Sequence, residues 1–212
     1  MRILLTALVA AAALAVTPLA AHAENWPDGR LDAIASTIAG HPVQVWCEDD
    51  DVEWDDAFVD SGLRGETVYG FTSLSDPTIY LAPRFCETLH VALDAGPEQA
   101  GLFWLAGATL VLTHESVHQR GIADEAQTEC TAYGMVGDVA ARFFGLSQTK
   151  TVVTLAPVTK TKTVRVGKKT VSVRYTTYVR RSTQVANPDW AGFLDDARMW
   201  HESTPPEYRQ GC

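Results

Sequence analysis

Residues 100–120 read AGLFWLAGATLVLTHESVHQR and form the strongest helical segment of the chain. Its first three turns are apolar on all sides, which predicts a helix buried through the core. Near its end stand His114-Glu115-Ser116-Val117-His118. Two histidines four residues apart lie on one face of a helix, so both imidazoles can reach a single metal ion. Glu115, beside the first histidine, can then take a proton from a water molecule activated at that ion.

A second helix is predicted directly after the first. Gly121 ends the first helix, Asp124 can cap the second, and Gln127 can complete a capping box. The amphipathic spacing continues to about Phe144 and ends at Gly145. The short connection predicts that the two helices form an antiparallel pair.

A catalytic zinc site usually takes a third protein ligand, and three acidic residues compete for it: Asp124, Glu125 and Glu129. Glu129 points from the middle of the apolar face and should meet the histidines at a similar depth. We therefore expect Zn²⁺ to be held by His114, His118 and Glu129. Glu125, one turn earlier, is expected to support the site or to be the alternative ligand, and Asp124 is more simply a cap.

The motif resembles the active helix of the zincin metallopeptidases, which carries His-Glu-x-x-His. A glutamate on the following helix is similar to the gluzincin branch, where two acidic residues stand four apart. In that branch the first binds metal and the second supports a histidine, which implies Glu125 as the ligand. The resemblance covers about residues 100–145. Residues 114–124 also resemble metzincins that use Asp as third ligand, but those continue with irregular chain and a methionine turn, whereas Met135 lies inside the predicted second helix.

The resemblance implies a secreted zinc-dependent metallopeptidase that hydrolyses peptide bonds by metal-activated water, with Glu115 as general base. The donor that would stabilise the oxyanion stays open among Arg120, Tyr133, His201 and Tyr208. The alternative is a non-catalytic secreted binding module with a structural metal site, whose working surface is a basic hairpin. Glu115 favours the enzyme, because a structural site needs no base.

The first 23 residues predict a secretory signal peptide. Arg2 is followed by an apolar core over residues 3–14, and residues 21–23 read Ala-His-Ala, a small-x-small cleavage site. Residues 24–212 are then expected to form a single secreted domain. Nothing later approaches the 18 apolar residues of a membrane span.

The four cysteines remain after this cleavage and favour two disulfides in an oxidising compartment. We favour the pairs Cys47–Cys86 and Cys130–Cys212, because the second would tie down the end of the chain.

Charge is distributed unevenly. Residues 150–181 hold nine Lys/Arg and no Asp/Glu, whereas the rest of the chain after residue 23 holds seven Lys/Arg and 26 Asp/Glu. The acidic body argues against nucleic acid as the main partner. The basic stretch could contact anionic surface polymers, although a solvated hairpin is the simpler interpretation.

A peptide or protein is the expected substrate, and the chain is expected to be a monomer.

The whole pattern predicts an α+β fold, zincin-like, with a small, mostly antiparallel sheet. The helix of the metal motif packs on the second helix, and a β-hairpin extension at residues 150–185 and a C-terminal helix follow. Thr78–Leu81 is either an ordinary core strand or an edge that adds an extended peptide. The expected strands are residues 43–47, 67–74 and 78–81, and the other expected helices are residues 31–39, 85–93 and 188–201.

Overall fold

The computed structural model describes residues 28–47, 54, 68–166, 168–210 and 212. The expected signal peptide, residues 1–23, lies outside them. The described residues form a mixed α+β structure, as expected. Its elements are α1 (Gly29–Ala39), β1 (Gln44–Cys47), β2 (Gly70–Thr72), β3 (Thr78–Leu81), α3 (Pro83–Ala95), α4 (Pro97–Ala100), α5 (Leu102–His118), α6 (Glu125–Phe143), β4 (Thr149–Val166), β5 (Lys169–Ala186), α7 (Pro188–Ser203) and η1 (Pro206–Arg209).

The small sheet has the strand order β1-β3-β2. β2 and β3 are joined by a short turn and pair antiparallel, whereas β1 pairs parallel with the other side of β3. The sheet is therefore mixed, and the expectation of a mostly antiparallel sheet is corrected. Because β3 is the central strand, Thr78–Leu81 cannot be the free edge. Within the described residues β2 has a partner on one side, so it is β2 that offers an edge near α5.

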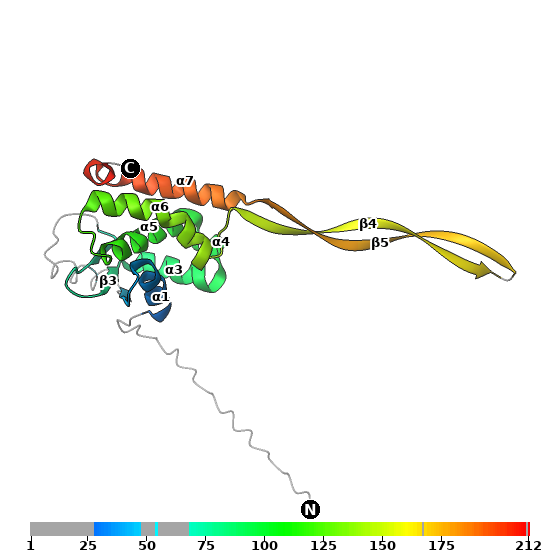
Figure 1. Cartoon of the computed structure of the whole chain (residues 1–212), viewed down its shortest axis with the longest axis horizontal. Coiled ribbons are helices and arrows are strands. Elements are labelled where there is room, and N and C mark those ends of the chain that lie inside the picture. Colours follow the sequence, from blue (N-terminus) through cyan, green and yellow to red (C-terminus); the bar gives the residue numbers. More distant parts are fainter. Residues whose placement is uncertain (1–27, 48–53, 55–67, 167, 211) are drawn as a thin grey trace, which may run out of the picture.

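Helix α5 is the centre of the core. Figure 1 shows it with α6 and α7 on one side and α1 and α3 on the other. Leu105, Leu112 and Val117 are completely buried on it, as the all-round apolar pattern predicts. Trp200 of α7 packs over Gly107, where a Cβ atom would clash with the indole ring, and its Nε1 donates a hydrogen bond of 2.9 Å to the carbonyl of Phe103.

The connection between α5 and α6 follows the predicted end signals. Gly121 has a φ of 84°, and its N–H donates to the carbonyl of His118 at 2.8 Å. Asp124 caps α6 by accepting a hydrogen bond from the N–H of Gln127 at 2.8 Å. This tight connection brings the first turn of α6 directly against the last turn of α5.

Two disulfides fasten the periphery, and both expected pairings are confirmed. Cys47–Cys86 joins β1 to α3, and Cys130–Cys212 joins α6 to the end of the chain. Among the described residues, no helix combines the length and the apolar character that crossing a membrane requires.

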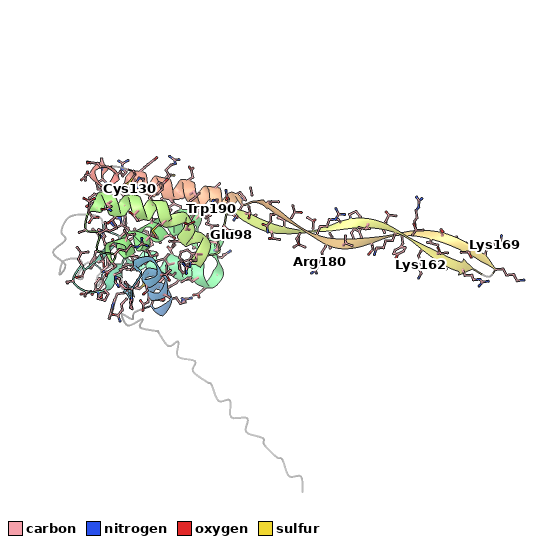
Figure 2. All side chains as sticks on the ribbon, viewed as in Figure 1. Glu98, Cys130, Lys162, Lys169, Arg180 and Trp190 are labelled. Carbon is pink, nitrogen blue, oxygen red and sulfur yellow. A yellow bond between two sulfur atoms is a disulfide. The ribbon has the colours of Figure 1, made fainter. Side chains whose placement is uncertain are left out.

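The basic segment is the expected hairpin. β4 and β5 pair antiparallel over their full length, from Thr149 opposite Ala186 to Val166 opposite Lys169. The hairpin leaves the helices as a twisted two-stranded ribbon (Figure 1), with side chains projecting from both faces along its length (Figure 2).

Candidate metal centre

Three side chains from α5 and α6 bring one potential ligand atom each to a common point. The Nε2 atoms of His114 and His118 are 3.1 Å apart, and Oε2 of Glu125 lies 3.1 Å from the first and 3.2 Å from the second. In a tetrahedral zinc site with bonds of about 2.0–2.1 Å, ligand atoms stand about 3.3 Å apart. The triangle therefore fits a zinc ion, and its two imidazoles and one carboxylate are a donor set that zinc accepts in proteins.

The orientation of both imidazoles is fixed from the side away from this triangle. Nδ1 of His118 donates to the carbonyl of Ile122 at 2.7 Å. Nδ1 of His114 lies 2.9 Å from Oε2 of Glu129. Since a carbonyl and a carboxylate accept hydrogen bonds, each Nδ1 carries the proton in the neutral ring, and each Nε2 keeps a lone pair for a metal ion.

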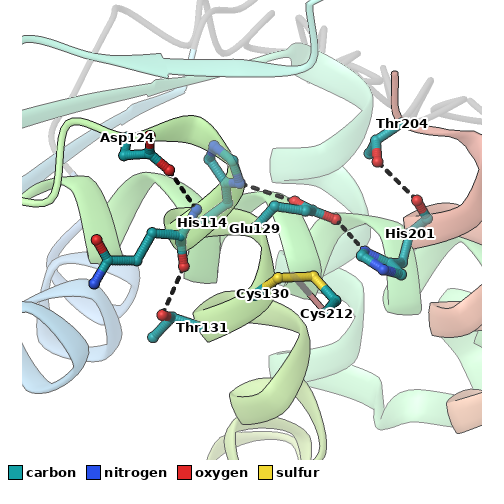
Figure 3. Close-up of a disulfide and its surroundings, with 9 residues drawn as sticks. His114, Asp124, Glu129, Cys130, Thr131, His201, Thr204 and Cys212 are labelled. Carbon is teal, nitrogen blue, oxygen red and sulfur yellow. Dashed lines mark hydrogen bonds and ion pairs between the residues drawn. A yellow bond between two sulfur atoms is a disulfide. The ribbon is translucent and has the colours of Figure 1, made fainter. Parts of the chain in front are cut away.

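Glu129 is buried and joins two histidines. Its Oε2 accepts from His114, and its Oε1 lies 2.8 Å from Nδ1 of His201 on α7, as Figure 3 shows. The ring of Tyr133 stacks on His201 with 4.4 Å between centroids. Glu129, expected as the third ligand, thus occupies the Nδ1 side of His114. Glu125, left open as the alternative, is the glutamate that meets both Nε2 atoms.

The site strongly favours positive charge. Burial acts to lower the pKa of His114, but hydrogen bonds to Glu125 and Glu129 outweigh it and raise this pKa to about 10. Hydrogen bonds to His114 and His118 lower the pKa of Glu125 to about 2. Burial opposes ionisation of Glu129, yet its bonds to His114 and His201 lower its pKa as well. Glu125, which stabilises a proton on Nε2, would stabilise a divalent cation at the same place, and Glu129 adds negative charge from the Nδ1 side of His114.

Glu115 is the general base that the sequence predicts, and it lies beside the triangle. The residue is 7% exposed, and burial raises the pKa of its carboxyl, partly offset by the nearby His114 and His118. Among the described residues no hydrogen bond holds its carboxylate. A carboxylate whose pKa is raised by burial and that lies beside the triangle suits the role of a proton acceptor.

Strand β2 passes directly over this base. A Cβ atom on Gly70 would stand 3.3 Å from Cγ of Glu115 and 2.6 Å from Cγ1 of Val111, so only glycine allows the strand to lie this close to α5. Tyr69, which precedes Gly70, lines a cavity of about 310 Å³. The cavity is lined mainly by aromatic rings and one stacked guanidinium, from Trp54, Val68, Tyr69, Arg84, Phe85 and Trp104.

The other sequence candidates have separate positions. Arg120 donates from Nε to the carbonyl of Ile38 at 2.6 Å and so ties α5 to α1. Asp124 is a cap, Tyr133 stacks on His201, and Tyr208 lies in η1. None of these contacts identifies an oxyanion donor.

His201 is named from the sequence only as a possible oxyanion donor, and its contact with Glu129 is not predicted, because it stands far from the motif in sequence. A weaker signal was available. Phe193, Ala197 and His201 are spaced four apart and form the buried face of α7. A histidine on a buried face needs a polar partner, and Glu129 supplies it.

No protein-family model, no curated protein and no solved structure matches this chain. Its chemistry is therefore inferred from the geometry of the site itself.

Proposed function

We propose that this protein is a secreted zinc-dependent metallopeptidase. The observation that carries the proposal is the triangle of His114 Nε2, His118 Nε2 and Glu125 Oε2, with the buried Glu115 beside it. The division of labour between Glu125 and Glu129 is similar to that of gluzincins, in which the first acidic residue binds metal and the second holds a histidine. The two disulfides favour an oxidising, extracellular compartment.

The donor set favours a catalytic site over a structural one. Structural zinc sites are closed by four protein ligands, whereas catalytic sites use three and keep one position open. Three described side chains converge here. The side chain of Glu125 is 44% exposed, so solvent and substrate can reach the ligand triangle.

A bound zinc ion would supply a Lewis acid that polarises the peptide carbonyl and acidifies a water molecule. Glu115 takes a proton from that water while the oxygen of the water attacks the carbonyl carbon. It then delivers the proton to the amide nitrogen, which leaves as an amine when the C–N bond breaks. Glu129 and Ile122 hold the two imidazoles in place throughout.

The substrate is an extended peptide that lies along the edge of β2. The face of β2 lies against Glu115 at Gly70, and within the described residues the outer edge of the strand can pair with an added strand. The aromatic cavity at Tyr69 would receive an apolar side chain of the same peptide.

The test compares Glu115→Gln with Glu98→Gln. Both variants replace a glutamate with glutamine. Glu98 is exposed on α4 and lies outside the described ion pairs, so its substitution should leave the site unchanged. We expect the natural chain and Glu98→Gln to bind one zinc ion and to cleave an unfolded protein such as reduced casein. Glu115→Gln should bind zinc equally and lose at least about 100-fold in kcat/KM. Cleavage that survives in Glu115→Gln, or in chelator-treated protein, would refute the proposal.

A second candidate, a non-catalytic binding module with a structural metal, is favoured by one observation: the basic hairpin is fully extended from the body. This candidate predicts that no variant hydrolyses peptides and that Glu115→Gln binds the partner of the hairpin as tightly as the natural chain does. The position of the buried Glu115 beside the triangle favours the enzyme, because a structural site needs no base.

A further inference from the structure

The hairpin β4–β5 has a size and isolation that the metal site does not require. Its 18 residue pairs make a ribbon about 60 Å long at about 3.3 Å per residue. A two-stranded ribbon without a second layer is marginally stable in water. Leu155 and Tyr178 are each 65% exposed on it. A surface this long and this open gains stability when a partner covers it.

The positive charges of the ribbon are fully available to such a partner. All nine Lys/Arg of residues 150–181 are exposed. Among the described residues, the ion pair of Lys150 with Asp189, at 3.3 Å, is the one that involves any of them. The remaining eight fall into three groups along the ribbon: a proximal group (Arg180, Arg181), a central group (Lys160, Lys162, Arg174) and a tip group (Arg165, Lys168, Lys169).

The strand register gives the spacing of these groups. Arg180 stands opposite Leu155, and Arg174 opposite Thr161, six residues further along; Lys169 stands opposite Val166. The centres of successive groups are therefore about 15–20 Å apart, and their nearest members, Lys162 and Arg165, are about 10 Å apart along one strand. Figure 2 shows Arg180, Lys162 and Lys169 following one another toward the tip. This spacing exceeds the screening length of about 8 Å at physiological salt, so each group attracts its own stretch of partner. A compact anion meets one group, and an extended polyanion meets all three.

The groups also present charge on both faces of the ribbon. Neighbouring residues of a strand point to opposite faces, which separates Arg180 from Arg181. In the central group Lys160 and Lys162 share one face, and Arg174 pairs with Thr161 and so lies on the other. A flat lipid surface or a stiff duplex touches one face of such a ribbon. A flexible chain can follow both faces around the twist.

The side chains between the cations suit sugar rings. Tyr175 and Tyr178 are exposed, and threonine hydroxyls flank them along both strands. An aromatic ring packs on the apolar face of a sugar, and a hydroxyl offers it hydrogen bonds. We infer that the hairpin is a binding arm for a flexible anionic polysaccharide, which holds the acidic body at a distance from the polymer. This inference does not depend on the proposed peptidase activity.

Dextran sulfate is the probe, and neutral dextran is its matched control because the two share a sugar backbone. We expect the full chain to bind dextran sulfate with an affinity that falls steeply with salt, and not to bind dextran. Fragments too short to reach two groups should bind at least about ten-fold more weakly than the long polymer, because they lose multivalency. Equal affinity for short and long chains would overturn the inference, as would binding of dextran.

The residue test compares two variants of equal net charge. Lys160→Gln with Lys162→Gln removes two cations of the central group, and Arg142→Gln with Arg198→Gln removes two exposed cations of the body. We expect a loss of about ten-fold or more in the first and little change in the second. Equal losses would mean that net charge alone attracts the polymer. The inference would also be overturned if the natural chain bound vesicles of phosphatidylcholine with phosphatidylserine, or duplex DNA, as tightly as it binds dextran sulfate. All variants should keep the unfolding temperature of the natural chain, since the changed residues are exposed.

Discussion

Glu129 and His201 are 72 residues apart in the chain, and a hydrogen bond of 2.8 Å joins Oε1 of one to Nδ1 of the other. The other carboxylate oxygen of Glu129 holds Nδ1 of His114 at 2.9 Å. A single buried glutamate thus connects the C-terminal helix α7 to a candidate metal ligand on α5. The disulfide Cys130–Cys212 fastens the chain end next to this glutamate (Figure 3).

Removal of His201 should weaken zinc binding without abolishing it. In His201→Ala one oxygen of the buried Glu129 loses its partner, so Glu129 and with it His114 are held less firmly. Loss of such outer contacts typically costs about 10–100-fold in metal affinity. Met199→Ala, an exposed change on the same helix, is the control. Competition with a chelator measures both affinities, and an unchanged affinity in His201→Ala would mean that Glu129 needs no support.

Glu125 and Glu129 should respond differently to substitution. Glu125→Ala removes an atom of the ligand triangle, and we expect it to lose zinc binding by more than about 100-fold. Glu129→Ala leaves the triangle complete and should lose about 10–100-fold. Zinc content and affinity of the two purified variants decide the matter. If Glu129→Ala loses the metal and Glu125→Ala keeps it, then Glu129, and not Glu125, is the third ligand.

Sequence reasoning predicted the parts of the site but not how they join. The helix pair, its caps and both acidic positions on α6 follow from local signals. The choice between Glu125 and Glu129 does not, because an imidazole has two nitrogens on opposite sides of its ring. Glu125 and Glu129 both contact His114, one at Nε2 and the other at Nδ1. Spacing along a helix places both near the ring and cannot say which nitrogen each one meets.

The sheet shows a similar limit. Alternating apolar residues predicted the strands around Val45, Phe71 and Ile79, and the antiparallel pairing of the last two is seen in the structure. The parallel pairing of Val45 with Ile79 depends on how the chain between β1 and β2 travels, for which local pattern carries no information. The hairpin was easier, because its two strands are adjacent in sequence and pair from Val166 opposite Lys169 outward.

Stability and zinc affinity should both depend on pH through the ligand triangle. In chelator-treated protein the pKa of His114, raised to about 10, contributes stability that is complete below about pH 6.5 and is lost as pH rises through 10. The pKa of Glu125, lowered to about 2, contributes stability that is present above about pH 4.5 and is lost as pH falls through 2. Zinc must displace the proton of His114, and the pKa of His118 is raised as well, so zinc affinity should rise by at least about ten-fold per pH unit across the neutral range.

Thermal unfolding of chelator-treated protein, followed from about pH 2 to pH 10, measures the change in stability. Zinc titrations between about pH 6 and pH 9 measure the change in zinc affinity. His114→Gln is the comparison, since it removes the group whose pKa is raised to about 10 and should flatten the alkaline loss of stability. A zinc affinity that stays constant over this range would mean that no proton is displaced from the triangle.

Gly70→Ala should disturb the site through packing alone. Its Cβ would stand 2.6 Å from Cγ1 of Val111, a β-branched side chain with little rotational freedom in a helix. Either β2 moves away from α5 or Glu115, 3.3 Å from the same Cβ, is displaced. We expect a loss of about 1–3 kcal/mol in the free energy of unfolding, with zinc stoichiometry kept and kcat/KM reduced.

Gly134→Ala provides the matched control, because a Cβ there meets nothing within 4 Å and the residue lies within helix α6. It should be neutral or slightly stabilising, since alanine is the better helix former. Val111→Ala removes the methyl group that obstructs the new Cβ, so the double variant Gly70→Ala with Val111→Ala should regain part of the lost kcat/KM. Denaturant unfolding and peptide hydrolysis test each variant. A Gly70→Ala protein as active as the natural chain would show that β2 does not need to lie against the base, which would remove the edge of β2 as the place where the substrate binds.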